Sequence, residues 1–108
     1  MPIEGDALGT LTYDSAVTVT FDDRMLAHLQ VVVWAKLRRG EQFSFTWAEG
    51  QPAEQARTSV WIAPSIPLAF RYDGTDVPEI DQRWIDALMR AANSAGGLRP
   101  LPQPEAER

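Results

Sequence analysis

Cysteine is absent from this sequence, and histidine and lysine occur once each, as His28 and Lys36. Without cysteine the chain can form no disulfide, no catalytic thiolate and no cysteine-ligated metal site. A mechanism that needs an imidazole or a side-chain amine has one residue of each kind to use. The sequence also lacks a glycine-rich phosphate loop and the spacing of a zinc site. We therefore predict no catalytic residue, no cofactor and no metal ligand.

Long hydrophobic runs are also missing. The longest unbroken apolar run covers residues 31–35, whereas a membrane-spanning helix needs about 20 such residues. Residues 1–6 contain neither a basic nor an apolar stretch, so they do not resemble a signal peptide. The absence of cysteine suits a reducing compartment. These features favour a cytoplasmic protein that does not associate with membranes.

The composition is that of one globular domain with an acidic surface. The chain has 108 residues, of which 44% are hydrophobic and 23% charged, and its net charge is −5. We predict a flexible lead-in over residues 1–7, a single domain over residues 8–102 and a disordered tail over residues 103–108. The negative charge disfavours nucleic acid as a partner, although a local basic patch can override it.

Alternation of apolar and polar residues predicts strands in five places along the chain. The pair Asp14-Ser15 suits a tight turn between the first two strands, because both side chains can bond nearby backbone groups. The predicted strands cover residues 8–13, 16–21, 42–47, 57–63 and 68–72.

Two helices are predicted between and after these strands. The first follows Asp22-Asp23, whose carboxylates suit a helix start, and it stops at Gly40, which can adopt the left-handed conformation. The second covers about residues 78–93, and Asp76 and Asp81 are alternative caps for it. The first helix carries one apolar stripe, formed by Leu26, Leu29, Val33 and Leu37.

The order of elements is strand, strand, helix, strand, strand, strand, helix, and a last short strand can follow near residues 98–101. Short connections between neighbouring strands favour antiparallel pairing. We predict an α+β fold with a single antiparallel sheet of five to six strands and both helices on one face of it.

Basic residues gather on one side of the first predicted helix. Arg24, His28 and Arg39 share that side, and Arg38 flanks them. One interpretation is an anion site for phosphate, nucleic acid or an acidic partner. The other is an ordinary solvated helix face, which the overall acidity favours.

A second candidate surface lies on the predicted strand over residues 57–63. If Val60 and Ile62 point into the core, then Arg57, Ser59 and Trp61 point outward. An exposed tryptophan beside an arginine is typical of a partner-binding face. The aromatic row at residues 43–47 can stack on bases of single strands, but a core beneath a helix is the usual role of such a row.

Seven runs resemble a family of short, uncharacterised actinobacterial proteins, and the resemblance extends over about residues 8–104. The runs are residues 21–30 (FDDRMLAHLQ), 35–41 (AKLRRGE), 43–47 (FSFTW), 59–61 (SVW), 66–70 (IPLAF), 84–85 (WI) and 92–98 (ANSAGGL). The sequence departs from the family at Asp14, where other members have a glycine.

Many members of that family carry the name ATP-dependent DNA ligase, so the resemblance implies a link to DNA repair. A ligase needs a lysine that accepts the adenylate within a Lys-x-Asp-Gly motif. The single lysine here, Lys36, is followed by Leu37-Arg38-Arg39 on a predicted helix with no phosphate loop. We therefore do not expect ligase activity.

Three hypotheses for the function remain. The first is a non-catalytic interaction or regulatory module that binds a protein partner or forms a homodimer. The second is a nucleic-acid-binding accessory module that uses Arg24, His28, Arg38 and Arg39. The third is an enzyme of an unrecognised kind, centred on His28 with Asp22 or Asp23.

Overall fold

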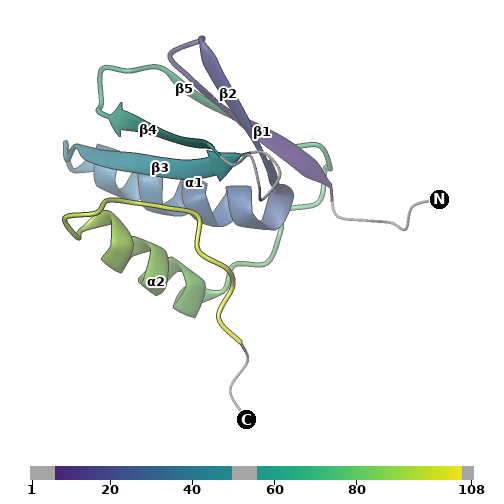
Figure 1. The fold of residues 1–108 in the computed structure, drawn as a ribbon. Coiled ribbons are helices and arrows are strands. Elements are labelled where there is room, and N and C mark those ends of the chain that lie inside the picture. The colour runs from purple at the N-terminus through teal and green to yellow at the C-terminus, as the bar shows by residue number, and fades with distance from the viewer. Residues whose placement is uncertain (1–6, 50–55, 106–108) are drawn as a thin grey trace.

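The computed structural model describes residues 7–49 and 56–105. Five strands and two helices follow one another in the order that the sequence predicts (Figure 1). They are β1 (Leu8–Tyr13), β2 (Val17–Asp22), α1 (Asp23–Arg38), β3 (Phe43–Glu49), β4 (Ala56–Ile62), β5 (Leu68–Arg71) and α2 (Gln82–Ala92).

The strands form two antiparallel sheets, so the prediction of a single sheet is wrong. One sheet has the order β2-β1-β5, and the other pairs β3 with β4. The break falls at residues 63–67, where Pro64 and Pro67 have no N–H to donate to a ladder. The strand β5 therefore does not fold back on β4, and it pairs with β1 instead, with Leu11 opposite Phe70.

Helix α1 lies in the middle of the molecule, between the strands and α2 (Figure 1). It packs against α2 on one side and against β1 and β2 on another, while α2 also contacts β3. The apolar stripe of α1 and the aromatic row of β3 meet in one core, as the pattern of the sequence indicates. The largest fully buried side chains are Phe45, Leu26, Leu29, Ile62, Leu88, Leu98, His28, Val32 and Val33.

Both helices begin at aspartate caps. The Asp22 carboxylate accepts the backbone N–H of Met25 at 2.8 Å, which confirms the predicted start of α1. At the other end Gly40 has a φ of +74°, the left-handed conformation that follows many helices. Of the two alternative caps for α2, the structure shows Asp81, so α2 begins later than predicted.

The chain after α2 returns along β3 and then over α2. Leu98 forms one parallel bridge with Phe45, donating to the Ser44 carbonyl and accepting from the Thr46 N–H. The additional strand is therefore a single bridge. Residues 103–105 of the expected disordered tail make hydrogen bonds to Arg24, Asp81 and Arg83. Residues 106–108 and residues 1–6 of the expected lead-in lie outside the described residues.

Two glycines with positive φ give a matched test of the close approach between residue 97 and β3. A Cβ on Gly97 would collide with Ser44 Oγ and lie 2.8 Å from the Ser44 carbonyl oxygen, whereas a Cβ on Gly40 would meet nothing within 4 Å. We expect Gly40→Ala to lower the free energy of unfolding by about 1 kcal/mol, from backbone strain alone. Gly97→Ala should cost about 2 kcal/mol more. Denaturant unfolding measures both losses, and equal losses would contradict the close approach.

Candidate functional site

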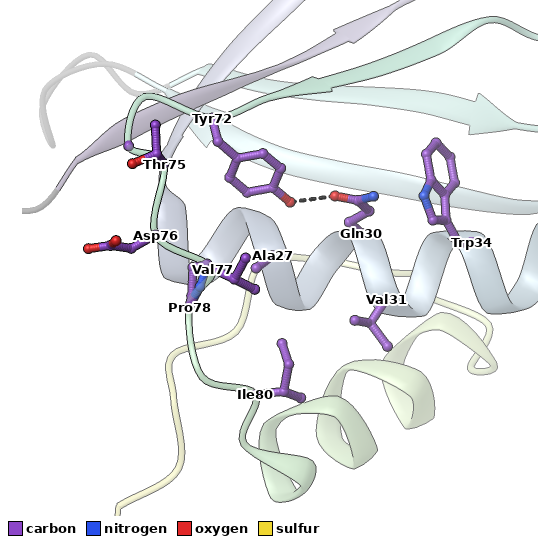
Figure 2. Close-up of a pocket in the computed structure, with 11 residues that line it drawn as sticks. Ala27, Gln30, Val31, Trp34, Tyr72, Thr75, Asp76, Val77, Pro78 and Ile80 are labelled. Atoms are coloured by element: carbon purple, nitrogen blue, oxygen red, sulfur yellow. Dashed lines mark hydrogen bonds between the residues drawn. The ribbon is translucent and has the colours of Figure 1, made fainter.

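An apolar groove of about 400 Å³ runs beside α1, between this helix and the segment 72–80 that leads from β5 to α2 (Figure 2). We call it the α1 groove. Its floor is formed by Ala27, Gln30, Val31 and Trp34, and its walls by Tyr72, Gly74, Thr75, Asp76, Val77, Pro78 and Ile80.

The floor is a second stripe on α1, beside the stripe that faces the core. Ala27, Val31, Trp34 and Arg38 are spaced by four, three and four residues, so they lie above one another on the helix. The Trp34 ring packs edge-on against Phe70 at 5.0 Å between centroids, which fixes this end of the floor. The sequence pattern predicts the core stripe alone, although the apolar Val31 and Trp34 beside it are a signal for a second one.

Exposed apolar side chains concentrate at this groove. Within the part of the chain that the structure describes, five large hydrophobic residues are exposed, and three of them line the groove. These are Val31 (39% exposed), Ile80 (43%) and Val77 (89%). Single exposed apolar residues are ordinary, whereas a cluster marks an interaction site. Because exposed apolar residues cluster there, we take the groove as the candidate functional site.

A polar contact closes the groove on the strand side. The Tyr72 hydroxyl donates to Gln30 Oε1 at 2.5 Å (Figure 2). Burial, together with the nearby negative charge of Asp23, raises the pKa of Tyr72 to about 12. Asp23 itself accepts the backbone N–H of Gly74 at 3.1 Å, which ties the start of the wall to α1. Tyr72 therefore remains a neutral hydrogen-bond donor through the physiological pH range.

Charge is distributed unevenly along the groove. The wall segment 72–80 contains Asp73, Asp76 and Glu79, all exposed, and no basic residue. The other end of the floor stripe carries Arg38, which is exposed one turn beyond Trp34. The groove thus has an acidic wall at Asp76, and the floor stripe ends beyond the groove at the basic Arg38.

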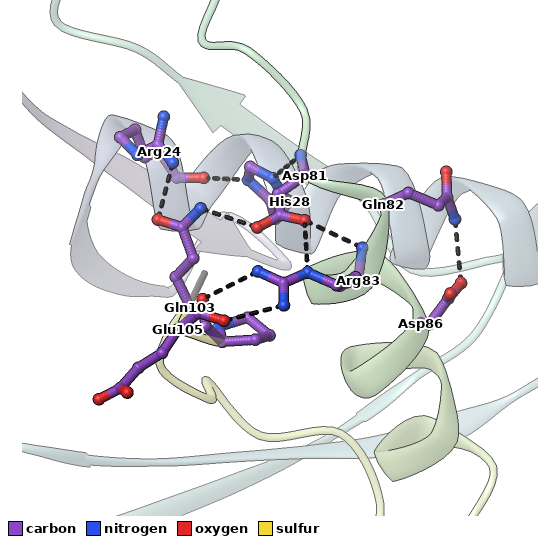
Figure 3. A network of polar contacts seen from close by, with 9 residues as sticks. Arg24, His28, Asp81, Gln82, Arg83, Asp86, Gln103 and Glu105 are labelled. Carbon is purple, nitrogen blue, oxygen red and sulfur yellow. Dashed lines mark hydrogen bonds and ion pairs between the residues drawn. The ribbon is translucent and has the colours of Figure 1, made fainter. Parts of the chain in front are cut away.

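His28 lies away from the groove, in a polar network between α1 and the start of α2 (Figure 3). Its ring is fully buried and stacks on Trp84 at 4.2 Å between centroids. Its Nε2 accepts the backbone N–H of Asp81 at 2.8 Å, so the ring proton lies on Nδ1 and is donated to the Arg24 carbonyl at 2.7 Å. The predicted place of His28 on an exposed basic face is wrong, because α2 covers that side of α1.

The other residues of the predicted basic face are spread over separate surroundings. Arg24 donates from Nη2 to Gln103 Oε1 at 2.8 Å and lies over the Trp84 ring. Arg39 pairs with Glu41 at 3.2 Å. Arg38 lies one turn beyond the α1 groove, in a neighbouring hollow that it lines with Trp34 and Leu37. The structure therefore does not bring Arg24, His28, Arg38 and Arg39 together as one anion-binding surface.

The same network fixes the start of α2 (Figure 3). The side chain of Gln103 donates to Asp81 Oδ2 at 2.9 Å, and Arg83 lies 3.8 Å from the same carboxylate. The Gln103 contact, reinforced by Arg83, holds the pKa of Asp81 below its usual value. The chain end after α2 is thus attached to the first turn of that helix and to α1.

Lys36 has an equally structural environment. Its buried ammonium donates to Asn93 Oδ1 at 2.5 Å and pairs with Glu41 Oε1 at 2.9 Å, above the Phe43 ring. The hydrogen bond from Lys36, with a second from Arg39, lowers the pKa of Glu41. The amine thus links the end of α1 to the end of α2.

The carboxylates named in the enzyme hypothesis have local contacts of their own. Asp22 caps α1, and Asp23 accepts the N–H of Gly74. His28 uses both ring nitrogens on backbone groups. Among residues 7–49 and 56–105, no three His, Asp or Glu side chains gather in a way that could hold a metal ion.

The three β4 residues that the alternation predicts to point outward are exposed in the structure. Arg57, Ser59 and Trp61 are exposed, while Ile62 is buried and Val60 is half-buried. The face lies across the molecule's second sheet and shares no residue with the α1 groove.

The fold and these surfaces define a small α+β domain with an apolar groove beside its first helix. A family model described as a domain of unknown function (DUF7882) matches residues 8–103, and the chain belongs to this family. Comparisons with curated proteins and with solved structures return no match. Neither helix in the described part of the chain has the length and apolarity needed to cross a bilayer.

The contacts of His28 predict a structural role that can be measured. His28→Phe keeps an aromatic ring against Trp84 but leaves the Asp81 N–H without its acceptor and removes the side-chain donor to the Arg24 carbonyl. We expect a loss of about 1–3 kcal/mol in the free energy of unfolding. Thr12→Val, which removes an exposed hydroxyl contact with Thr18, is the control and should change stability by less than about 0.5 kcal/mol. A loss as small as that of the control would contradict the role of His28.

The raised pKa of Tyr72 predicts how stability varies at alkaline pH. Between the ordinary value of 10.0 and the folded value of about 12, the unfolded chain loses this proton while the folded chain keeps it. The free energy of unfolding therefore falls over this range, and Tyr72→Phe should remove that part of the fall. The difference in tyrosinate absorbance between the wild type and Tyr72→Phe should show a midpoint near pH 12. A midpoint near pH 10 would refute the buried environment.

Proposed function

We propose that this protein is a small interaction module that self-associates, and that the occupant of the α1 groove is a second copy of the chain. The convergence of Val31, Val77 and Ile80 on one groove carries this proposal. Apolar side chains exposed in a cluster gain free energy when a partner removes them from water, at roughly 25 cal/mol per Å².

Charge complementarity favours a second copy over other partners. Paired copies commonly meet through a two-fold axis, which brings the same surface of each copy together in opposite directions. The floor stripe from Ala27 to Arg38 is about 16 Å long, at 1.5 Å per helical residue. A two-fold axis across the middle of α1 therefore sets the acidic wall at Asp76 beside Arg38 of the second copy, and the reverse pair forms as well.

The expected strength of the dimer is modest. A standard interface buries about 800 Å² on each partner, which is more than the lining of a single groove supplies. Leu37 and Pro64, which extend the apolar surface beyond Trp34, lie where the second copy continues past the groove. We therefore expect a dimer that dissociates at micromolar concentration.

The basic helix face of the nucleic-acid hypothesis receives no support from the arrangement of its residues. Its histidine is buried, Arg39 is paired with Glu41, and Arg24 contacts Gln103. The contacts of Lys36 likewise give no support to a lysine that accepts an adenylate.

Analytical ultracentrifugation over a range of concentrations tests the dimer and the place of its interface. Val77→Ser truncates a groove residue that is 89% exposed, and Leu8→Ser truncates a residue that is 57% exposed outside the groove. Each change occurs twice in a two-fold dimer, so Val77→Ser should weaken dimerisation at least about tenfold, which corresponds to 1.4 kcal/mol. Leu8→Ser should leave it unchanged. A wild-type monomer at ~1 mM would overturn the proposal.

Charge exchange tests the two-fold arrangement separately from dimerisation itself. Asp76→Arg and Arg38→Asp should each weaken the dimer, since each creates two like-charged pairs. The double variant restores opposite charges across the interface and should recover most of the wild-type affinity. A double variant weaker than both single variants would show that Asp76 and Arg38 do not face one another.

A further inference from the structure

The second sheet has an outer face that differs in composition from the rest of the surface. Alternate residues of β3 and β4 point outward in register, so that Ser44 lies opposite Trp61, Thr46 opposite Ser59 and Ala48 opposite Arg57. The returning segment after α2 lies along β3 and adds Arg99, which lines a hollow of about 350 Å³ together with Arg57 and Thr46. We call these seven residues the outer sheet face.

The charge of this face is opposite to that of the whole chain. The net charge of the protein is −5, yet the outer sheet face contains two arginines and no aspartate or glutamate. Arg57 and Arg99 are both exposed. Guanidinium groups pair with phosphate and carboxylate oxygens, so the charge of the face selects an anionic ligand.

Trp61 lies on this face and is 52% exposed. One hydrogen bond holds its ring and another holds its backbone. Its Nε1 donates to Gln42 Oε1 at 2.9 Å, and its backbone carbonyl accepts the Tyr13 hydroxyl at 2.8 Å. A hollow of about 560 Å³ opens beside it, lined in part by Ser44 and by the paired side chains of Lys36 and Glu41. An indole ring whose N–H is paired and that remains half-exposed offers a flat surface for stacking.

The centre of the face carries small side chains, most of them polar. The Thr46 and Ser59 hydroxyls bond one another at 2.6 Å, and Ser44 and Ala48 are also small. Trp61 and Arg57 are four residues apart on one strand, about 13 Å at 3.3 Å per residue. A ligand that contacts both must be extended, with anionic groups along its length and a flat ring at one of its positions.

We propose that the outer sheet face binds single-stranded nucleic acid, with one base stacked on Trp61 and the phosphates paired with Arg57 and Arg99. Exposed bases and a phosphate backbone supply the ring and the anions that the face requires. A duplex encloses its base faces, and a simple polyanion has no ring for Trp61. The face shares no residue with the α1 groove, so this proposal does not depend on dimerisation.

Fluorescence anisotropy with a labelled oligothymidine of about 12 nucleotides tests the proposal on the full chain. Two phosphate contacts predict a slope of about −1.4 for log K against log salt, a loss of about sevenfold between 50 and 200 mM. The comparison ligands are a duplex of equal length, a heparin fragment and oligoglutamate. Each should bind more weakly than the oligothymidine. No binding at about 50 mM salt, or tighter binding of any comparison ligand, would overturn the proposal.

Substitutions separate stacking from charge. Trp61→Leu should weaken binding at least about fivefold, while Trp61→Phe should retain most of the affinity because it keeps a flat ring. Arg57→Gln and Arg99→Gln should each reduce the salt slope by about 0.7. Arg90→Gln, an exposed α2 residue with the same charge change, is the matched control. If Arg57→Gln and Arg90→Gln changed the salt slope equally, the binding would depend on net charge alone, and the site would be refuted.

Discussion

The structure depends on the burial of α1 between the strands and α2. Half of this helix is buried, including three polar side chains, Asp23, His28 and Lys36. Polar groups removed from water must find partners or cost free energy, and each of these three meets a group on a later segment: Asp23 the turn after β5, His28 the start of α2, and Lys36 the end of α2. Among the described residues, no buried side-chain nitrogen or oxygen lacks a partner. The helix therefore positions the later parts of the chain through polar contacts as well as through its apolar stripe.

Local patterns in the sequence predicted local structure well. The cap at Asp22, the stop at Gly40 and the alternation that exposes Trp61 all depend on near neighbours in the chain, and each is present. The pairing of β5 with β1 joins residues about sixty positions apart, and the sequence carries no local signal for it. The prediction that His28 lies on an exposed face was wrong for a similar reason. Helical spacing gives the side of α1 on which a residue lies, but it does not tell which side α2 will cover.

Only part of the α1 groove could be predicted from the sequence. Its floor could have been found, because Val31 and Trp34 form an apolar stripe beside the core stripe. Its wall could not, because residues 72–80 reach α1 through the turn that Asp23 holds, some fifty residues away along the chain. The outer sheet face was predictable in its β4 half, from the alternation at Arg57, Ser59 and Trp61. Arg99 joins that face through the single bridge at Leu98, which only the folded chain reveals.

The acidic net charge is the sum of surfaces that differ in sign, and this bears on how the two proposals combine. Acidic residues gather on the groove wall, whereas the outer sheet face has arginines alone. Because the groove and the face have no residue in common, a dimer formed through the groove would carry two outer sheet faces. A single strand long enough to reach both would bind the second face at the raised effective concentration that tethering provides. Self-association would then strengthen nucleic-acid binding without any new contact, and the length of the strand would govern that gain.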